Sequence, residues 1–463
     1  MKKEQTARER ALVIGGSMAG LLAARTLSDH FKEVIILDRD QFPDRPEHRR
    51  GTPQTRHAHG LLASGLQEIE GLFPGISDEM ISQGAVKCDP ANDGLWVFEG
   101  AAMKQGDSNS VGMLVSRPLL EHSIRRRVMR LPNVRVAQGY AVRSLAHHSG
   151  RVTGVRTDDG TIRADLTVDA SGRGTLAFKW LADIGFEAGE EESVKVDISY
   201  TTRMFRRSTD ALGGDGFAVI TPQLKNLKSG VMLAQEGDLW VATLIGRAGE
   251  RSPEDLEGFI EYSRQLQTRH IYDVVRRAEP VGDAAVMRYP ASVRRRYEKR
   301  SEAPLGFLAF GDAICSFNPI YGQGMSVAAQ EAAALGEVLA AGDRNLAHRF
   351  YKRAAAIIDT PWEIAVGGDL KLPETPGHRS LKTRFINWYI GKVQQCAQTD
   401  EAATVAFIRV AQLLDPPESL MRPSMMRRVL KGAIVRRFRR SFSDRSRGLS
   451  RLRTPRVEHP GIR

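Results

Sequence analysis

The chain has 463 residues, enough for two or three domains, and its 41% hydrophobic and 7% aromatic content argues against a disordered protein. Its three cysteines, Cys88, Cys315 and Cys396, are too few and too far apart for a disulfide framework or a cysteine-based metal site. The sequence shows no secretory signal peptide and no run of 18 apolar residues, so we expect a cytoplasmic protein without a membrane span.

The first predicted unit is a strand, a glycine-rich turn, a helix and a second strand. Apolar residues 11–14 precede the turn Gly15-Gly-Ser-Met-Ala-Gly20, and residues 34–37 lead into the acidic Asp38. Such a βαβ unit is typical of dinucleotide binding, because small residues admit a pyrophosphate to the helix N-terminus and the carboxylate accepts hydrogen bonds from ribose. Ser17 replaces the middle glycine of the motif, and its hydroxyl could donate to a phosphate. Taken alone, this segment also fits another kind of α/β domain.

The middle of the chain contains a turn-rich stretch, then a helix, and then two groups of short strands. Residues 74–112 are rich in turns, and residues 116–131 have helical spacing with a basic face. Strands are predicted at 134–137, 141–145, 151–157 and 161–168, then at 194–205, 217–220, 230–233 and 240–245, followed by a helix at 253–265. The second group predicts an antiparallel sheet inserted into the nucleotide-binding domain.

A second glycine-rich segment follows almost three hundred residues after the first. Apolar residues 307–310 predict a buried strand, Gly311 and Asp312 a turn, and the alanine-rich residues 326–339 a helix. Asp312 can accept hydrogen bonds from sugar-alcohol hydroxyls, while Gly322 and Gly324 leave bare backbone against which a flat ring can lie. The two segments together predict the two ends of one flavin-binding cleft.

Six stretches of the chain resemble a known family. They are Gly15–Gly20, Arg49–His59, Ser116–Glu121, Val168–Arg173, Gly311–Met325, and Pro361–Ala365 with Asp369–Gly377. Over residues 10 to 432 the chain resembles bacterial class A flavoprotein monooxygenases, specifically the branch with the epoxidases of polyether-ionophore biosynthesis, and more distantly squalene epoxidase. The resemblance implies bound FAD, reduction by NAD(P)H, and transfer of one oxygen atom from O₂ to an alkene or activated ring, but it does not identify the substrate. Because the sequence has only one dinucleotide fingerprint, NAD(P)H either visits the flavin transiently or is used by a separate flavin reductase. We expect an apolar polyketide- or terpenoid-like substrate. Epoxidation and hydroxylation both stay open.

The resemblance also implies which residues contact the cofactor. Residues 17–19 would meet the pyrophosphate, Asp38 and Arg39 the adenosine half, Val142 the adenine, and Arg117 the linking phosphates or ribose. One of the pair Arg49 and Arg50 should approach the cofactor, and the sequence does not decide which. No catalytic side chain is assigned, because oxygen transfer from a flavin demands no general acid or base. The expected cofactor-binding residues are Gly15, Gly16, Ser17, Met18, Ala19, Gly20, Asp38, Arg39, Arg49, Arg50, Arg117, Val142, Gly311, Asp312, Pro319, Gly322, Gly324 and Met325.

We therefore expect an α/β protein with a Rossmann-like FAD-binding domain of the glutathione-reductase type, an inserted antiparallel-sheet substrate domain and a helical C-terminal region. The FAD-binding domain would be discontinuous, comprising residues 1–75, 113–190 and 301–345. The substrate domain would comprise residues 76–112 and 191–300, and the helical region residues 346–436. Residues 437–463 would form a basic, disordered tail.

Three other interpretations compete with a monooxygenase. A flavin-dependent halogenase and a prenyl-chain or alkene reductase would share the scaffold, but the chain lacks the Trp-x-Trp-x-Ile-Pro motif of the first and the Tyr-x-Trp-x-Phe-Pro motif of the second. A non-catalytic flavoprotein that binds an acidic partner through its tail is the third. His57 and His59 lack the carboxylates or cysteines of a metal site, so we expect no metal, and they line the flavin pocket or lie in a plain loop.

The whole net charge of +12 lies in the last part of the chain. Residues 422–463 contain 14 of the 67 Lys and Arg residues but only two acidic residues, so the rest of the chain is neutral. Apolar residues at helical spacing accompany this charge, namely Met426, Val429, Leu430, Ala433, Ile434 and Phe438. The segment either packs on the protein as a helix or contacts an anionic membrane or an acyl-carrier protein. Nucleic acid is not expected as a partner.

Overall fold

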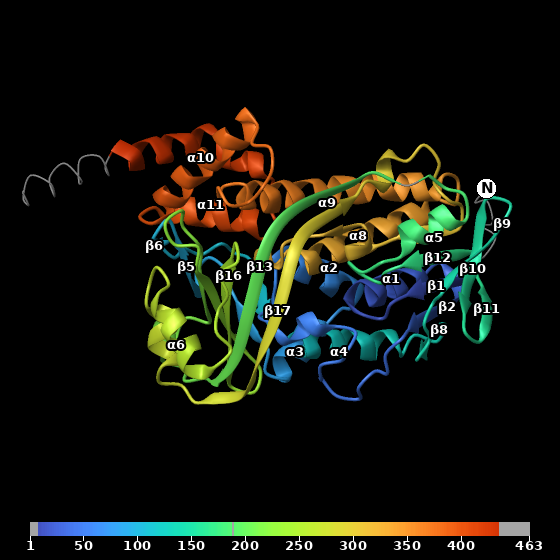
Figure 1. Ribbon diagram of the computed structural model, residues 1–463, viewed down its shortest axis with the longest axis horizontal. Coiled ribbons are helices and arrows are strands. Elements are labelled where there is room, and N and C mark those ends of the chain that lie inside the picture. Colours follow the sequence, from blue (N-terminus) through green and yellow to red (C-terminus); the bar gives the residue numbers. More distant parts are fainter. Residues whose placement is uncertain (1–7, 188, 435–463) are drawn as a thin grey trace, which may run out of the picture.

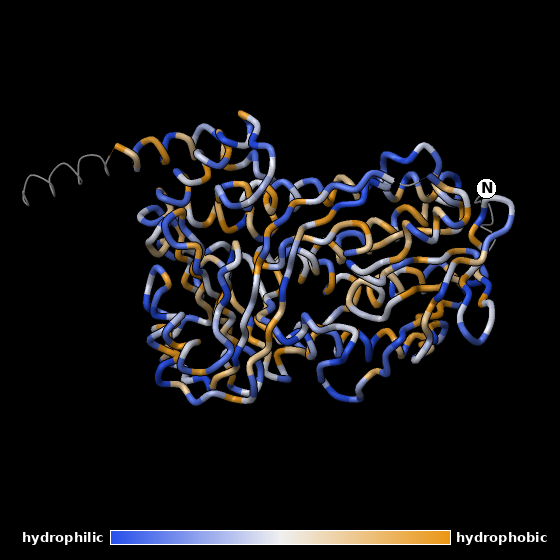
Figure 2. Tube along the Cα trace, viewed as in Figure 1, coloured by the Kyte–Doolittle hydropathy of each residue, from blue (hydrophilic) through white to orange (hydrophobic). Residues whose placement is uncertain are grey.

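The computed structural model describes residues 8–187 and 189–434. Figure 1 shows an α/β body, which carries the N-terminal strand, side by side with a second body built around a large sheet. Helices of the C-terminal region extend along both bodies. In Figure 2, hydrophobic segments follow the strands and helices of both bodies, while the outer loops are mostly hydrophilic.

The α/β body is built on a five-stranded sheet in which every strand pair is parallel. Because the strands run the same way, Ile14, Asp38 and Asp169 end at the same edge, which is where such sheets bind ligands. Helices α1, Met18–Ser28, and α8, Gly324–Ala340, pack against each other beside this sheet. The strands, in spatial order, are β18 (Phe307–Ala309), β12 (Leu166–Asp169), β1 (Arg8–Ile14), β2 (Phe31–Asp38) and β8 (Val134–Gln138).

The single strand expected at 161–168 is wrong, because the chain turns a corner inside it. The structure has β11, Gly160–Arg163, in an antiparallel three-stranded sheet and β12 in the parallel sheet. At the corner, the Asp165 carboxylate accepts hydrogen bonds from the backbone N–H groups of Glu9 and Arg10, at 2.9 and 3.0 Å. The other strands of the small sheet are β9 (Ser144–His148) and β10 (Arg151–Thr157).

The second body contains an eight-stranded sheet. One edge of this sheet is formed by strands β5 and β6, which lie within residues 74–112, a stretch that the sequence predicts to be rich in turns. All its strand pairs are antiparallel except β14 with β5, which are parallel, so the expected purely antiparallel insert is corrected there. Helices α6, Leu256–Arg264, and α7, His270–Val275, pack on this sheet. In spatial order the strands are β19 (Cys315–Ser316), β17 (Pro280–Arg295), β13 (Glu191–Arg206), β16 (Leu239–Arg247), β15 (Ser229–Gln235), β14 (Phe217–Ile220), β5 (Gly94–Phe98) and β6 (Ala101–Ala102).

Shorter elements connect the two bodies. A small sheet joins β3, Gly60–Leu61, and β4, Val86–Cys88, through β7, Gly112–Leu114. The remaining helices pack on the α/β body and are α2 (Ala63–Leu72), α3 (Ile76–Ser82), α4 (Arg117–Val128) and α5 (Ala177–Asp183).

The C-terminal region is helical, as the sequence predicts. Helices α9 (Leu346–Asp369), α10 (Leu381–Ala397) and α11 (Glu401–Ala411) are followed by helical residues 423–434, which we call the terminal helix. Its buried residues are Met425 and Val429, whereas Met426, Leu430 and Ile434 are exposed, so Val429 alone packs inward among the described residues of the predicted apolar stripe. Residues 437–463, the predicted tail, lie outside the described residues. No described helix has the length and hydrophobicity required to span a bilayer.

Candidate functional site

A single cavity of about 1460 Å³ extends from the glycine-rich turn of β1 to the C-terminal helices, with walls from both bodies. Fourteen of the eighteen predicted cofactor residues line it, including Asp38, Arg49 and Asp312. The four that do not line it are Gly16, Gly20, Arg50 and Gly311. The structure therefore brings the two glycine-rich segments together in one cleft.

Three glycines shape the first turn. Gly15 has φ +95°, and a Cβ there would lie 2.7 Å from the Ala170 carbonyl oxygen. A Cβ on Gly20 would lie 1.8 Å from the Gly15 carbonyl oxygen, so only glycine lets helix α1 begin so close to the strand. Gly16 donates its backbone N–H to Asp38 Oδ2 at 2.7 Å. Gly16 and Gly20 thus shape the turn from behind, which explains why neither lines the cavity.

The Ser17 hydroxyl is not available to a phosphate, contrary to the expectation. It donates to Glu121 Oε2 at 2.6 Å and accepts from Arg117 Nη2 at 3.1 Å. A hydroxyl has one hydrogen to donate, and that of Ser17 is donated to Glu121. Because no side chain caps helix α1, the backbone N–H groups of its first turn are what this end of the cavity offers to an anion.

Arg49, rather than Arg50, belongs to the cavity. Its side chain is only 6% exposed, and its Nη1 lies 3.2 Å from Asp38 Oδ2 and 3.1 Å from Asp40 Oδ2. Arg50 is exposed and does not line the cavity. The Arg49 Nη2 is buried and has no hydrogen-bond partner among the described residues.

Arg117 is buried beside Arg49 and is not the surface residue of an ordinary helical ion pair. Its Nε lies 3.6 Å from Glu121 Oε2, and this Nε has no hydrogen-bond partner in the described chain. Burial lowers the pKa of Arg117 below its usual 12.5, and the carboxylates of Glu121 and Asp312 oppose that shift. Glu121 also accepts a hydrogen bond from Arg49 Nε at 3.0 Å. Glu121 was assigned no role from the sequence, although it ends the Ser116–Glu121 stretch and follows Arg117 by one helical turn.

The second glycine-rich segment reaches the cavity from the opposite side. Asp312 lines the cavity; burial raises the pKa of its carboxyl above the usual 3.8, while Arg117 and Arg173 act to lower it. Gly311 has φ +63°, and a Cβ there would lie 2.8 Å from Ala19 Cβ, so this glycine lets the two segments touch. Gly322, with φ +68°, turns the chain into helix α8, whose first turn has no side-chain cap.

These groups fit a dinucleotide with two phosphates. Two buried guanidinium nitrogens, Arg49 Nη2 and Arg117 Nε, have no hydrogen-bond partner among the described residues, although Arg117 Nε is ion-paired with Glu121. A buried donor without a hydrogen bond is costly unless a ligand accepts from it. Backbone N–H groups at the starts of α1 and α8 add further donors, and Asp312 offers an acceptor for hydroxyls. Arginines that donate to phosphates and carboxylates that accept from sugar hydroxyls are the kinds of groups that suit FAD.

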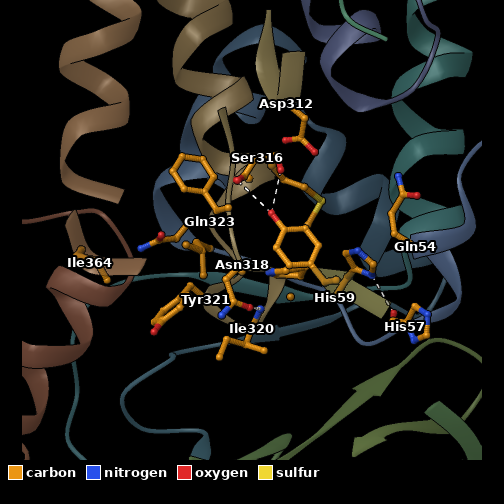
Figure 3. A pocket seen from close by; sticks show the side chains of 18 of the residues that line it. Gln54, His57, His59, Asp312, Ser316, Asn318, Ile320, Tyr321, Gln323 and Ile364 are labelled. Carbon is orange, nitrogen blue, oxygen red and sulfur yellow. Dashed lines mark hydrogen bonds between the residues drawn. The ribbon is translucent and has the colours of Figure 1, made fainter. Parts of the chain in front are cut away.

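Two histidines lie across the cavity from the turn before α8. Figure 3 shows His57 and His59 with Gln54 on the side opposite Tyr321, Gln323 and Ile364. His57 Nδ1 lies 2.8 Å from Thr202 Oγ1, and His59 Nδ1 lies 2.8 Å from the His57 carbonyl oxygen. Burial lowers the pKa of His57 to about 4 and that of His59 to about 3, so both rings are neutral at neutral pH. The described chain has no His, Cys, Asp and Glu group suited to a metal ion.

The end of the cavity away from the glycine-rich turns is mostly apolar, with a few polar residues such as Asn387 and Gln394 in its lining. Its walls come from the large sheet, from α9 and α10, and from residues near α11, so the inserted sheet and the C-terminal region together enclose it. The apolar residues that line this end include Trp96, Phe98, Phe217, Val219, Val231, Leu233, Trp362, Ile364, Ile386, Ile390, Phe407 and Leu420.

Comparison with known proteins identifies the family. The family model described as "FAD binding domain" matches residues 8–349. The chain belongs to this FAD-binding family. It binds FAD and is an FAD-dependent oxidoreductase of the flavin monooxygenase type.

Individual proteins support this assignment. The chain is 31% identical over 433 residues to Protein Rv3254 of Mycobacterium tuberculosis, covering 88% of this chain and 90% of that protein. It is 24% identical over 338 residues to ubiquinone hydroxylase UbiL of Rhodospirillum rubrum, covering 72% of each. A triple mutant of the flavin-dependent brominase Bmp2 has the same fold, with a TM-score of 0.64, 17% identity, and coverage of 94% of this chain and 99% of that one.

Proposed function

We propose that this flavoprotein transfers one oxygen atom from O₂ to an apolar, alkene-bearing or aromatic natural-product substrate of the polyketide or terpenoid kind, and that epoxidation is preferred over hydroxylation. The observation that carries the proposal is the continuity of the cavity. Its polar end holds the groups that fit FAD, and its other end is lined by aromatic and aliphatic side chains. An apolar substrate can therefore lie against the cofactor without leaving the same enclosed space.

The residues of the chain position the cofactor and the substrate and exclude water from the cavity. Bound FAD supplies the activation of O₂ once NAD(P)H has reduced it. Arg49 and Arg117 hold the phosphates, and the turn that begins with Pro319 and ends at Gly324 supports the ring. Apolar residues such as Val231 and Ile390 would exclude water from the space beside the cofactor and so limit unproductive side reactions. His57 and His59 are neutral and give no acid group near neutral pH, in keeping with a transfer that needs no general acid.

The source of reducing equivalents forms a second part of the proposal. The sequence has one dinucleotide fingerprint, and the groups around Gly15 that belong to it fit FAD. NAD(P)H therefore either visits the flavin transiently or reduces it through a separate reductase. Mixing the anaerobic holoenzyme with NADH or NADPH and following flavin absorbance separates the two cases, since a separate reductase leaves the flavin oxidised.

Isotope labelling tests the oxygen transfer. Reduced holoenzyme is incubated with linear polyene and terpenoid substrates under ¹⁸O₂, and the products are weighed by mass spectrometry. One ¹⁸O atom per product with loss of an alkene indicates epoxidation, and one ¹⁸O atom with the alkene retained indicates hydroxylation. Label from water, halide-dependent products, or loss of an alkene without oxygen gain contradicts the proposal, the last two pointing to a halogenase or a reductase.

A pocket variant tests the location of the substrate. Val231 lines the apolar end, so Val231→Asp places a charge in the proposed substrate space, and we expect turnover to fall by at least tenfold while bound flavin is retained. Val286→Asp is the matched control, because Val286 is 44% exposed and does not line the cavity. Equal turnover in both variants contradicts this assignment of the pocket.

A further inference from the structure

Helix α10 presents large apolar side chains to solvent. Leu381 is 84% exposed, Trp388 58% and Phe385 49%. These residues lie three or four positions apart and so form one stripe along the helix. Solvent-facing apolar stripes of this kind are uncommon in proteins that have no partner on that surface.

The terminal helix has a second exposed apolar stripe. Met426, Leu430 and Ile434 lie four positions apart and are 48%, 64% and 49% exposed. An adjacent face of this helix is buried through Met425 and Val429, in the same cluster as residues of α10. Figure 1 shows both helices on the outer edge of the molecule. We call the six exposed residues of the two stripes the docking face.

Basic residues flank the docking face. Arg384 lies within the α10 stripe, and Arg427 and Lys431 lie beside the terminal-helix stripe; all three are exposed and form no ion pair with a described residue. The nearby acidic residues are partly neutralised, since Asp400 pairs with Arg428 at 2.9 Å. The docking face is therefore apolar at its centre and positive at its rim.

The other side of α10 forms part of the cavity wall. Ile386, Ile390 and Gln394 line the cavity, and their positions on the helix are opposite the Leu381 stripe. The cavity also reaches the surface beside the stripe, because Lys382 and Glu363, which pair at 3.5 Å, line it with side chains that are 72% and 66% exposed. Helix α10 thus lies between the cavity and its own exposed stripe, and one opening of the cavity lies at the N-terminal end of this helix.

We propose that the docking face binds an anionic lipid surface, and that the cavity mouth beside Leu381 receives its apolar substrate from that surface. A helix with exposed Trp, Phe and Leu side chains and flanking arginines lies in the membrane interface with its apolar side toward the acyl chains. The positive rim attracts anionic headgroups. An acidic carrier protein would match the charge but would leave six large apolar side chains without a matching surface. Uptake of the substrate from the membrane rests on the proposed apolar substrate, whereas binding of the docking face to the membrane does not depend on it.

Vesicle flotation of the full-length holoenzyme tests the proposal. Vesicles of phosphatidylcholine alone are compared with vesicles containing about one-third phosphatidylglycerol. We expect flotation only with the anionic vesicles, and release at about 0.5 M NaCl as the charges are screened. The triple variants L381S/F385S/W388S and M426S/L430S/I434S should each bind at least tenfold more weakly. The control L224S/L305S removes two residues that are 60% and 58% exposed elsewhere, and it should bind as the wild type does.

Trp388 provides a second readout. Vesicles with brominated acyl chains quench a tryptophan that enters them, and we expect quenching in the wild type that the W388F variant loses. Absence of flotation, flotation unaffected by both triple variants, or binding only to an acidic acyl-carrier protein overturns the proposal. These outcomes do not depend on turnover, so failure of docking and failure of the oxygen-transfer proposal are distinguished by the flotation and labelling experiments.

Discussion

The Glu121 carboxylate offers the sharpest test of how this site is held together. Its side chain is 5% exposed, accepts from Ser17 and Arg49, and lies within 4.0 Å of Arg117 and Arg125. Glu121→Gln keeps the size of the side chain and removes the charge. Arg49 still pairs with aspartates, but Arg117 loses its only ion-pair partner among the described residues.

The magnitude follows from the burial of these charges. Removing one partner of a buried ion pair costs about 3–5 kcal/mol, because the other charge stays in a low-dielectric site. Since glutamine can still accept hydrogen bonds, we take the lower end, about 3 kcal/mol, which corresponds to roughly a 150-fold change in the unfolding equilibrium. Displacement of one guanidinium from the cofactor should also weaken FAD binding by about 1.5–3 kcal/mol, or roughly 10- to 150-fold.

Urea unfolding of the apoprotein and fluorescence titration with FAD measure the two effects separately. Glu261→Gln is the matched control, because Glu261 forms an exposed ion pair with Arg264, and its loss should leave both measurements nearly unchanged. If Arg117 is the unpaired charge, the double variant R117M/E121Q should lose less stability than the sum of the single variants. Additive single variants, or a Glu121→Gln variant that behaves like the control, would refute this reasoning.

Three further predictions concern the cavity. Asp312→Ala should weaken FAD binding by about 1–3 kcal/mol through lost hydrogen bonds to ribitol, measured by the same titration against Asp343→Ala as a surface control. Gly15→Ala should abolish FAD binding or folding, because Gly15 has φ +95° and a Cβ there would lie 2.7 Å from the Ala170 carbonyl oxygen. Gly150→Ala is the control for backbone strain alone, because Gly150 also has a positive φ but has open space around it. The pKa of His59 is about 3 in the folded protein against 6.5 in the unfolded chain, so the unfolded chain binds more protons between these two pH values. The free energy of unfolding should therefore fall by up to about 1.4 kcal/mol per pH unit as the pH drops below 6.5. In urea unfolding at several pH values, His59→Gln should make this slope smaller.

The parts of the fold that the sequence predicts are those with a strong local signal. The first turn requires glycines for steric reasons that the sequence displays, and the strand β14 matches its predicted span of Phe217–Ile220. Strand β17 was not predicted, because Pro280, Gly282 and Pro290 argue against a strand interior. For most of its length β17 pairs with β13 alone, and a strand that is paired on one side only tolerates proline. The pairing register also shifts next to Pro290, which has no amide hydrogen to donate.

The site was predicted less completely than the fold, for a related reason. Residues adjacent to a glycine motif can be found by spacing, whereas Glu121 acts through arginines that lie 72 and four positions away. Only the folded chain brings such groups together. The choice between Arg49 and Arg50 also depends on tertiary structure, since the two residues begin a turn, closed by the hydrogen bond from Thr52 N–H to the Arg49 carbonyl, and only Arg49 reaches the aspartates.

Asp369 connects elements from the two ends of the cavity through hydrogen bonds. Its side chain is fully buried and accepts hydrogen bonds from Arg247 at 3.3 Å, Asn318 at 2.8 Å and Tyr321 at 3.3 Å. These partners come from the large sheet and from the turn before α8, while Asp369 ends α9. A Cβ on Gly368 would lie 2.3 Å from the Tyr321 hydroxyl, so the contact needs glycine there. Because a buried carboxylate must keep its partners, the turn before α8 is coupled to the large sheet and to the end of α9.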